Sequence, residues 1–174
     1  MWLKLVVMFT DRPPRIREAR RDDAAALARL QEGIYADGRW FVGHTAPTES
    51  MLRHRIRELV PHDSLYLVAE VDGHLAGWLE LNRLRPERMR HVALLTVAVH
   101  EAYRRRGVGR ALLHESYGWG GRVGISKITL NVRARNTPAI ALYEAEGFVL
   151  EGRETAQFVV ADGFEDNLIM ARRI

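Results

Sequence analysis

The sequence predicts an α+β fold, with a mixed and mainly antiparallel sheet of roughly six to seven strands flanked by about four helices. Apolar residues recur at helical spacing within residues 20–60, and a strong hairpin signal follows at Asp72-Gly73. Beyond residue 90 the pattern alternates strand, helix, strand, helix and a final hairpin. Residues 15–174 are therefore predicted to form one domain, with residues 1–14 as an N-terminal arm or an extra strand.

Each helix is expected from its apolar spacing and its start signal. Asp22 is the expected N-cap of an Ala-rich helix over residues 23–31, and Thr48 that of a second helix reaching Val60. A third helix is expected over residues 108–117, because Gly118, Gly120 and Gly121 follow it. A fourth is expected over residues 137–146.

The strands are expected where the period changes to that of a sheet. Residues 65–71 and 75–84 flank the two-residue Asp72-Gly73 turn, so they are predicted to pair antiparallel. Residues 92–99 are apolar almost throughout, which is typical of a central strand. The remaining expected strands are 16–19, 127–132 and a last hairpin that turns at Asp162-Gly163.

Composition narrows the classes of function. The 174 residues include no cysteine, which excludes disulfides, cysteine-ligated zinc and a thiol nucleophile. The apolar run at residues 1–9 is interrupted by Lys4 and has no cleavage site, and no stretch is long enough to span a bilayer. We therefore expect a cytoplasmic protein that does not bind membranes. The seven histidines show no metal-ligand spacing, so no metal is expected.

The net charge of +4 rests mainly on arginine. Three interpretations stay open: a solvated basic surface, attraction to a phosphorylated cofactor, or attraction to nucleic acid. The chain lacks both a basic strand interleaved with aromatic residues and a recognition-helix pattern. A nucleic-acid-binding module is therefore the less favoured alternative.

The most informative segment runs from Leu95 to Leu113. A buried strand leads into a turn that ends in Gly107-Val-Gly109 and opens a helix. Glycines let the backbone approach a ligand, and the first helical amides have no intrahelical partners. With the positive end of the helix dipole, they form an anion site suited to a pyrophosphate. Four arginines surround this turn: Arg104, Arg105, Arg106 and Arg110. Taken alone, the segment could equally be a tight turn with arginines in solvent.

Two motifs together resemble those of the GCN5-related N-acetyltransferase (GNAT) family. Arg104-x-x-Gly107-x-Gly109, after Leu95-x-Val97-x-Val99, is similar to the acetyl-CoA-binding motif of that family. The second half of the family signature follows as Asn136-x-x-Ala139-x-x-Leu142-Tyr143-x-x-x-Gly147-Phe148. The resemblance covers residues 15–172 in element order. The C-terminal part loosely resembles the subgroup that acts on small amino acids and related amines.

The resemblance implies that the chain transfers acetyl from acetyl-CoA to a primary amine by direct attack in a ternary complex. The strand containing Val97 would splay from the strand containing Leu130, and the pantetheine arm would lie in that gap. An amide of the first strand would polarise the thioester carbonyl. The implied cofactor-binding residues are Val97, Ala98, Val99, Arg104, Arg105, Arg106, Gly107, Val108, Gly109, Arg110, Asn136 and Tyr143.

The implied catalytic groups are Tyr143 and Glu80. In the family, the tyrosine protonates the leaving thiolate, although Tyr143 could instead pack against the sheet. The two familiar positions of the general base hold Ala93 and Asn131 here, which leaves Glu80 as the best acidic candidate. Glu80 could also be a solvent-facing strand residue. A catalytically silent domain that senses acetyl-CoA is a further alternative, and the family suggests a homodimer through the C-terminal strands.

Overall fold

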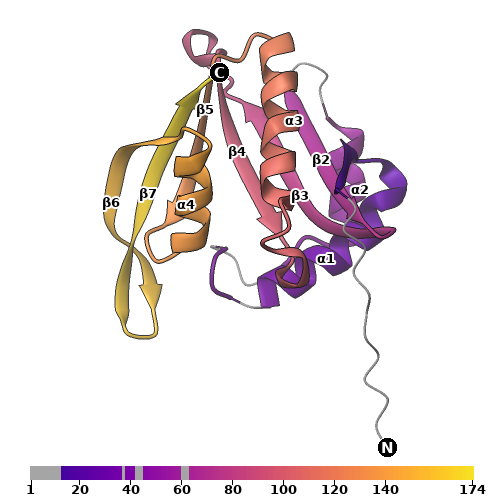
Figure 1. Cartoon of the computed structure of the whole chain (residues 1–174), viewed down its shortest axis with the longest axis horizontal. Coiled ribbons are helices and arrows are strands. Elements are labelled where there is room, and N and C mark those ends of the chain that lie inside the picture. Colours follow the sequence, from indigo (N-terminus) through magenta and orange to yellow (C-terminus); the bar gives the residue numbers. More distant parts are fainter. Residues whose placement is uncertain (1–12, 37, 42–44, 60–62) are drawn as a thin grey trace, which may run out of the picture.

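Figure 1 shows a computed structural model of the chain, which describes residues 13–36, 38–41, 45–59 and 63–174. The expectation of an N-terminal arm or extra strand at residues 1–14 lies almost wholly outside these residues. Seven strands form one sheet in the order β1-β2-β3-β4-β5-β7-β6. They are β1 (Arg15–Glu18), β2 (Ser64–Val71), β3 (His74–Arg83), β4 (Val92–Val99), β5 (Lys127–Arg133), β6 (Val149–Val160) and β7 (Gly163–Arg173). All neighbouring pairs are antiparallel except β4 and β5, which confirms the predicted α+β class.

Two helices cover each face of the sheet (Figure 1). On one face, α1 (Ala24–Ala36) and α2 (Glu49–Arg57) pack their buried residues against Tyr66, Val68 and Trp78. The other face is covered by α3 (Val108–Arg122) and α4 (Thr137–Ala145). Side chains alternate along each strand, so the same strands supply both cores.

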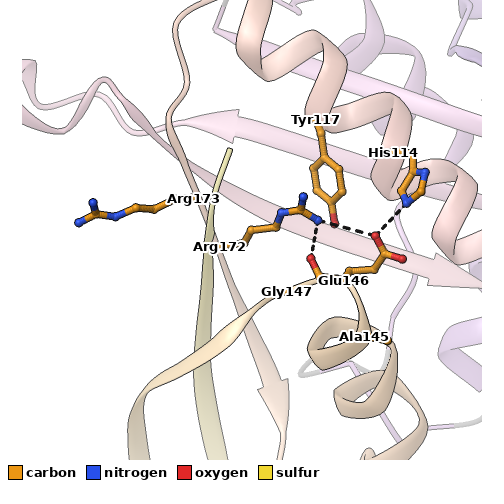
Figure 2. Close-up of a pocket in the computed structure, with 7 residues that line it drawn as sticks. All are labelled: His114, Tyr117, Ala145, Glu146, Gly147, Arg172 and Arg173. Carbon is orange, nitrogen blue, oxygen red and sulfur yellow. Dashed lines mark hydrogen bonds and ion pairs between the residues drawn. The ribbon is translucent and has the colours of Figure 1, made fainter.

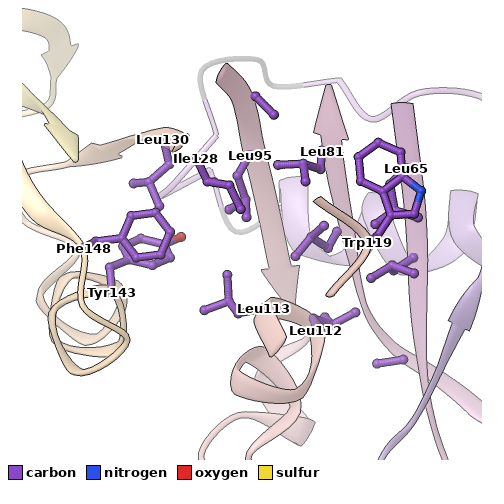
Figure 3. Close-up of a cluster of buried hydrophobic side chains, with 14 of the residues drawn as sticks. Leu65, Leu81, Leu95, Leu112, Leu113, Trp119, Ile128, Leu130, Tyr143 and Phe148 are labelled. Atoms are coloured by element: carbon purple, nitrogen blue, oxygen red, sulfur yellow. The ribbon is translucent and has the colours of Figure 1, made fainter. Parts of the chain in front are cut away.

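The larger core lies under α3 and α4 (Figure 3). Leu112 and Leu113 of α3 are fully buried against the central strands. Tyr143 and Phe148 extend the same core to the α4 side, with ring centroids 5.6 Å apart. Together these contacts fix α3 and α4 on either side of the β4–β5 junction.

The β4–β5 junction is short. The two strands pair in parallel over four residue pairs, from Val92 with Lys127 to Leu95 with Leu130. Beyond Leu95 and Leu130 they diverge, and Figure 1 shows the opening between them. The sequence-based expectation that the Val97 strand splays from the Leu130 strand is therefore met by the strand pairing.

The first helix begins later than the sequence suggests. Asp22 is not its N-cap, because a turn of 3₁₀ helix at Arg21–Asp23 precedes α1. The carboxylate that matters is that of Asp23, which accepts a hydrogen bond from the backbone N–H of Arg20 at 2.6 Å. Asp23 also binds the guanidinium of Arg17 through both oxygens, at 2.7 and 2.8 Å. An ion pair with β1, rather than a cap by Asp22, thus fixes the start of this segment.

The third helix runs through the glycines that were expected to end it. α3 continues to Arg122, because Gly120 is a packing position: a Cβ there would lie 2.8 Å from Cδ1 of Ile174. The chain turns only at Gly124, whose φ of 80° suits glycine. Thr48, by contrast, is confirmed as the N-cap of α2, where its Oγ1 accepts from the N–H of Met51 at 3.3 Å. None of the helices in the described ranges is long and apolar enough to cross a membrane.

Candidate active site

The open edge of β4 is the first element of the site. The N–H of His100 donates to the carbonyl of Ala76 on β3 at 2.9 Å, so even-numbered residues of β4 direct their backbone groups toward β3. The backbone N–H and C=O groups of Val97 and Val99 therefore face the gap, the opening between β4 and β5 beyond Leu95 and Leu130. No described residue of β5 pairs with them. The carbonyl of Val99 accepts from Nε of Arg104 at 3.1 Å. The backbone of Ala98 faces β3 and its side chain is buried under α1, so it does not face the gap.

The N-terminus of α3 forms the second element. Arg105 and Gly107 both have positive φ angles, of 63° and 75°, which turn successive amides inward. The first intrahelical bond of α3 runs from the N–H of Ala111 to the carbonyl of Gly107. The preceding amides, including those of Val108 and Gly109, thus have no intrahelical acceptor. We call this turn, from Arg105 to Gly109, the amide cradle. A Cβ at Gly107 would meet nothing within 4 Å, so open space lies beside this turn.

The four arginines of this loop differ in their surroundings. Arg104 is half-buried and holds the end of β4, as described above. Arg105 and Arg106 are exposed, and the guanidinium of Arg106 lies 5.7 Å from the ring centroid of Tyr103. Arg110 binds α4, because its Nε lies 2.8 Å from Oε1 of Glu146. Arg105, Arg106 and Arg110 are thus all exposed, and Glu146 holds the last of them.

Glu146 contacts two further side chains, those of His114 and Arg172, at the C-terminal end of α4 (Figure 2). His114 Nε2 lies 2.9 Å from its carboxylate, and Arg172 binds both its backbone carbonyl and its carboxylate. These residues border a surface hollow of about 640 Å³ with Tyr117, whose ring lies 4.2 Å from the Arg172 guanidinium carbon. This cluster joins α3, the end of α4 and β7.

Tyr143 lies on α4 beside the gap. Its side chain is only 7% exposed, and Figure 3 shows the hydroxyl directed away from α4 toward the β4 side. Burial raises the pKa of Tyr143 far above the ordinary value of 10, and Tyr117 adds to this shift. The hydroxyl therefore keeps its proton, and no residue in the described ranges forms a hydrogen bond with it. It can donate a hydrogen bond to a group in the gap.

Asn136 has a structural contact of its own. It is the N-cap of α4, where its Oδ1 accepts from the N–H of Ala139 at 3.4 Å. This capping bond fixes the start of the helix that carries Tyr143. The structure therefore gives Asn136 a capping role.

Glu80 projects from β3 on the α1–α2 face of the sheet. It stands directly across from Thr96 on β4, the residue at which β4 leaves β5. Its side chain is 13% exposed, and Oε1 accepts from Nη1 of Arg55 on α2 at 2.8 Å. The alternative that Glu80 faces open solvent is wrong, because α2 covers it. Ala93 lies in the core on the opposite face.

Asn131 is the first residue of β5 beyond its last pair with β4. Its Oδ1 accepts from Nδ2 of Asn167 at 2.9 Å, and the same nitrogen donates to Oε2 of Glu154 at 2.6 Å. Asn167 is buried on β7, and Glu154 lies on β6. Three residues here were not among the predicted site residues: Asn167, Glu154 and Arg55. No motif marks them, because only the pairing of the strands and the packing of α2 bring them to this end of the gap.

The comparison with protein families decides which interpretation of this geometry applies. Residues 25–148 match the model of the acetyltransferase (GNAT) family. The chain belongs to the GNAT acetyltransferase family. The matched region contains both motifs of the GNAT signature. The first motif forms the amide cradle before α3, and the second lies on α4 with Tyr143.

Several relatives of the chain are named as N-acetyltransferases. The chain is 32% identical over 163 residues to the L-amino acid N-acetyltransferase of Escherichia coli K12, covering 90% of this chain and 96% of that one. It is 41% identical over 78 residues to the [ribosomal protein bS18]-alanine N-acetyltransferase of the same strain. That match covers 45% of this chain and spans only 53% of the relative's length.

Among solved structures, a phosphinothricin acetyltransferase of Sinorhizobium meliloti in complex with acetyl-CoA has the same fold. Its TM-score is 0.85 at 22% identity, covering 94% of this chain and 89% of that one.

Proposed function

We propose that this GNAT enzyme transfers the acetyl group of acetyl-CoA to the primary amine of a small amino acid or a related amine. The observation that carries the proposal is the unpaired edge of β4, next to the amide cradle of α3. Pantetheine contains two amide groups, so it can pair with Val97 and Val99 as a strand would. The cradle at Gly107 would hold the pyrophosphate. Residues 15–174 would act as one unit.

The reaction needs no covalent enzyme intermediate. The neutral amine nitrogen attacks the carbonyl carbon of the thioester, and the negative charge that develops on oxygen is stabilised by a backbone N–H facing the gap. The nitrogen then loses its extra proton to water, the intermediate collapses, the carbon–sulfur bond breaks, and the electron pair leaves with the sulfur. Tyr143 stands on the α4 side with its proton retained, and we assign it as the donor to the leaving thiolate.

The acceptor must reach the thioester as a neutral amine. Glu80 would accept the ammonium proton, because its carboxylate lies beside Thr96 where β4 leaves β5. The replacement Glu80→Gln keeps the shape and hydrogen-bonding capacity of the side chain but removes the base. If Glu80 is the base, kcat falls about 10²–10⁴-fold near neutral pH and recovers as pH rises and more acceptor is already neutral. A parallel loss at every pH would contradict the assignment.

The acceptor class is the finer part of the proposal. The L-amino acid enzyme matches over nearly its whole length, whereas the bS18-alanine enzyme matches over about half. An N-alpha-acetyltransferase of Sulfurisphaera tokodaii also matches over 90% of this chain and 91% of its own length, at 30% identity, so coverage alone does not choose the acceptor. The proposal of a free amino acid follows the L-amino acid enzyme, at 32% identity. A cytoplasmic location and a homodimer through the C-terminal strands are further expectations. Val149 and Leu150 on the edge strand β6 are exposed and support the second. Light scattering after size exclusion would test it.

Two measurements on the purified protein test the activity. The first is a thermal-shift titration with acetyl-CoA, where a ligand at a hundredfold its Kd stabilises by about 2.7 kcal/mol. The second is thiol release from acetyl-CoA over a panel of amino acids and amines. A thermal shift with thiol release for one class of amine supports the proposal. A shift without release from any amine would favour an acetyl-CoA-sensing domain. No shift at millimolar acetyl-CoA, with salt-sensitive binding to nucleic acid, would favour the nucleic-acid alternative.

A further inference from the structure

Arg55 is the cation nearest to the proposed base, and the active site described so far does not use it. It projects from α2 to the sheet, and its Nη1 lies 2.8 Å from Oε1 of Glu80. Glu80 in turn stands across from Thr96, at the point where β4 leaves β5. Arg55 and Glu80 thus present one positive and one negative group side by side at the α1–α2 side of the gap.

The contacts of Arg55 differ from those of the other arginines on α2. Arg53 forms a helix-surface pair with Glu49, and Arg57 binds the adjacent Glu58. Arg55 instead leaves its own helix to reach the sheet, and its side chain remains 49% exposed. A guanidinium has five N–H donors in a planar fork, and the pair with Glu80 uses one of them. The remaining donors can bind a second carboxylate.

The surroundings of this ion pair are aromatic. Tyr35 of α1 stacks on Phe41 with ring centroids 4.5 Å apart, and Phe41 lies 6.0 Å from Trp78. Burial raises the pKa of Tyr35, and the charge of Glu80 raises it further, which shows that Tyr35 lies within the electrostatic reach of the pair. Tyr35 therefore borders the ion pair on one side, while the exposed half of the Arg55 side chain stays open to an acceptor.

We propose that Arg55 binds the α-carboxylate of a free amino acid acceptor while Glu80 receives its amino group. This inference rests on the proposed N-acetyltransferase function and names the residue that sets its specificity. In an α-amino acid, the nitrogen and the carboxyl carbon are about 2.5 Å apart. Adjacent contacts to Glu80 and Arg55 match that spacing. The carboxylate takes the unused donors of Arg55, and the amine lies between Glu80 and the thioester.

The arrangement discriminates between classes of amine. The N-terminus of a peptide carries an amide next to its amino group, and a simple alkylamine carries neither an amide nor a carboxylate. Neither can form the charge-assisted bidentate pair with Arg55. An amino acid should therefore react with a kcat/KM about 10- to 100-fold higher than that of its own α-amide, the ratio expected from one hydrogen-bonded charge pair.

The test compares each reactive amino acid with its α-amide, in the wild type and in two variants. Thiol release is measured first with the twenty common L-amino acids, and then with the α-amides of those that react. Because Arg55 also contacts Glu80, the readout is the ratio of acid to amide. Arg55→Gln should lower kcat/KM for the acid about 10- to 100-fold more than for the amide, so the preference disappears. Arg55→Lys, which keeps the charge but not the fork, should give an intermediate ratio. Arg53→Gln, on the same helix, is the matched control and should retain the wild-type ratio.

The outcomes separate this inference from the proposed function. Thermal shifts with acetyl-CoA that equal those of the wild type show that each variant is folded and binds the cofactor. If acids and amides react equally well, or if Arg55→Gln keeps the wild-type ratio, Arg55 does not bind the carboxylate of the acceptor. That result overturns the inference and leaves the proposed transferase function unaffected. If no amine releases thiol from a protein that binds acetyl-CoA, the transferase function fails and the inference fails with it.

Discussion

Gly109 of α3 and Leu142 of α4 are in contact across the gap: a Cβ at Gly109 would lie 3.0 Å from Cδ2 of Leu142. The absence of a side chain at Gly109 therefore lets the two helices approach each other. This contact sets how far Tyr143, the neighbour of Leu142, stands from β4. The second glycine of the motif thus has a packing role that is distinct from the backbone role of Gly107.

Replacement of Gly109 by valine should push α4 away from α3. Overpacking of this kind typically costs about 1–3 kcal/mol, so we expect a lower free energy of unfolding in urea. Turnover should fall as well, because the displacement moves Tyr143. Wild-type stability together with wild-type turnover would show that the contact between Gly109 and Leu142 does not position α4.

Gly107→Val should weaken acetyl-CoA binding more than it weakens the fold. The φ of 75° strains any residue with a Cβ, and the new side chain would enter the open space of the amide cradle. Gly124→Val is the matched control, because Gly124 has a φ of 80° and equally open surroundings but lies beyond the other end of α3. Isothermal titration should show a higher Kd for acetyl-CoA in the Gly107 variant only. Equal Kd values in the two variants would argue against the cradle.

Tyr143→Phe should lower kcat about 10²–10⁴-fold, the range typical of a lost proton donor. The Kd for acetyl-CoA should stay close to that of the wild type, since the ring and its contact with Phe148 are retained. Steady-state kinetics with titration calorimetry would measure both quantities. A wild-type kcat in this variant would remove the assignment of Tyr143 as the acid.

Alkaline pH should destabilise the protein through its buried tyrosines. Burial raises the pKa of Tyr66 and of Tyr143, which are 1% and 7% exposed. Below pH 10 both are neutral in the folded and unfolded states, so they contribute no pH dependence. As pH rises above 10, the unfolded chain loses protons that the folded protein retains, and stability falls by about 1.4 kcal/mol per pH unit for each tyrosine. Urea unfolding at pH 9 to 11 should show this slope, with a shallower one in Tyr143→Phe.

Acid should weaken the Arg17 cluster. Hydrogen bonding to Arg17 holds the pKa of Asp23 below its ordinary value, against the opposing effect of burial. The stabilisation is therefore present above the unfolded pKa of about 3.9 and is lost as pH falls through the lower folded value. Arg17→Met should cost about 1–3 kcal/mol at pH 7, and this cost should shrink progressively as pH falls below about 3.9. Arg15→Met is the control, because Arg15 is 74% exposed and lies 3.8 Å from Glu70. A cost for Arg17→Met that is independent of pH would contradict this account.

Where hydropathy period and turn chemistry agree, the sequence predicts the fold closely. β4 has the expected bounds, Val92–Val99, and the last hairpin turns between Val160 and Gly163 as Asp162-Gly163 indicates. The end of α3 was mispredicted, because the packing of Gly120 on Ile174 overrides the tendency of glycine to end helices. Helix propensity acts locally, whereas this contact joins segments far apart in the chain.

The polar partners of the gap are harder to predict for the same reason. Counting back from the Asp162-Gly163 turn would place Ala156 opposite Asn167. A bulge between Glu154 and Phe158, where Ala156 has a φ of 53°, shifts the register so that Glu154 takes that place. The motif residues of the cradle are recognisable because glycine spacing encodes backbone shape. No short sequence pattern indicates the ion pair of Arg55 with Glu80, because it joins a helix and a strand that are 25 residues apart in the chain.

The short β4–β5 junction also gives the sheet a hinge. Strands β1 to β4 form one leaf and β5 to β7 the other, and the two leaves share backbone hydrogen bonds only along the stretch that ends at Leu95 and Leu130. Moving the two strands further apart beyond these residues breaks no backbone hydrogen bonds between β4 and β5. The resistance to widening comes instead from the side chains of α3 and α4, where Leu142 meets Gly109. The spacing of the two leaves beyond Leu95 and Leu130 therefore depends on how α3 and α4 pack rather than on the sheet.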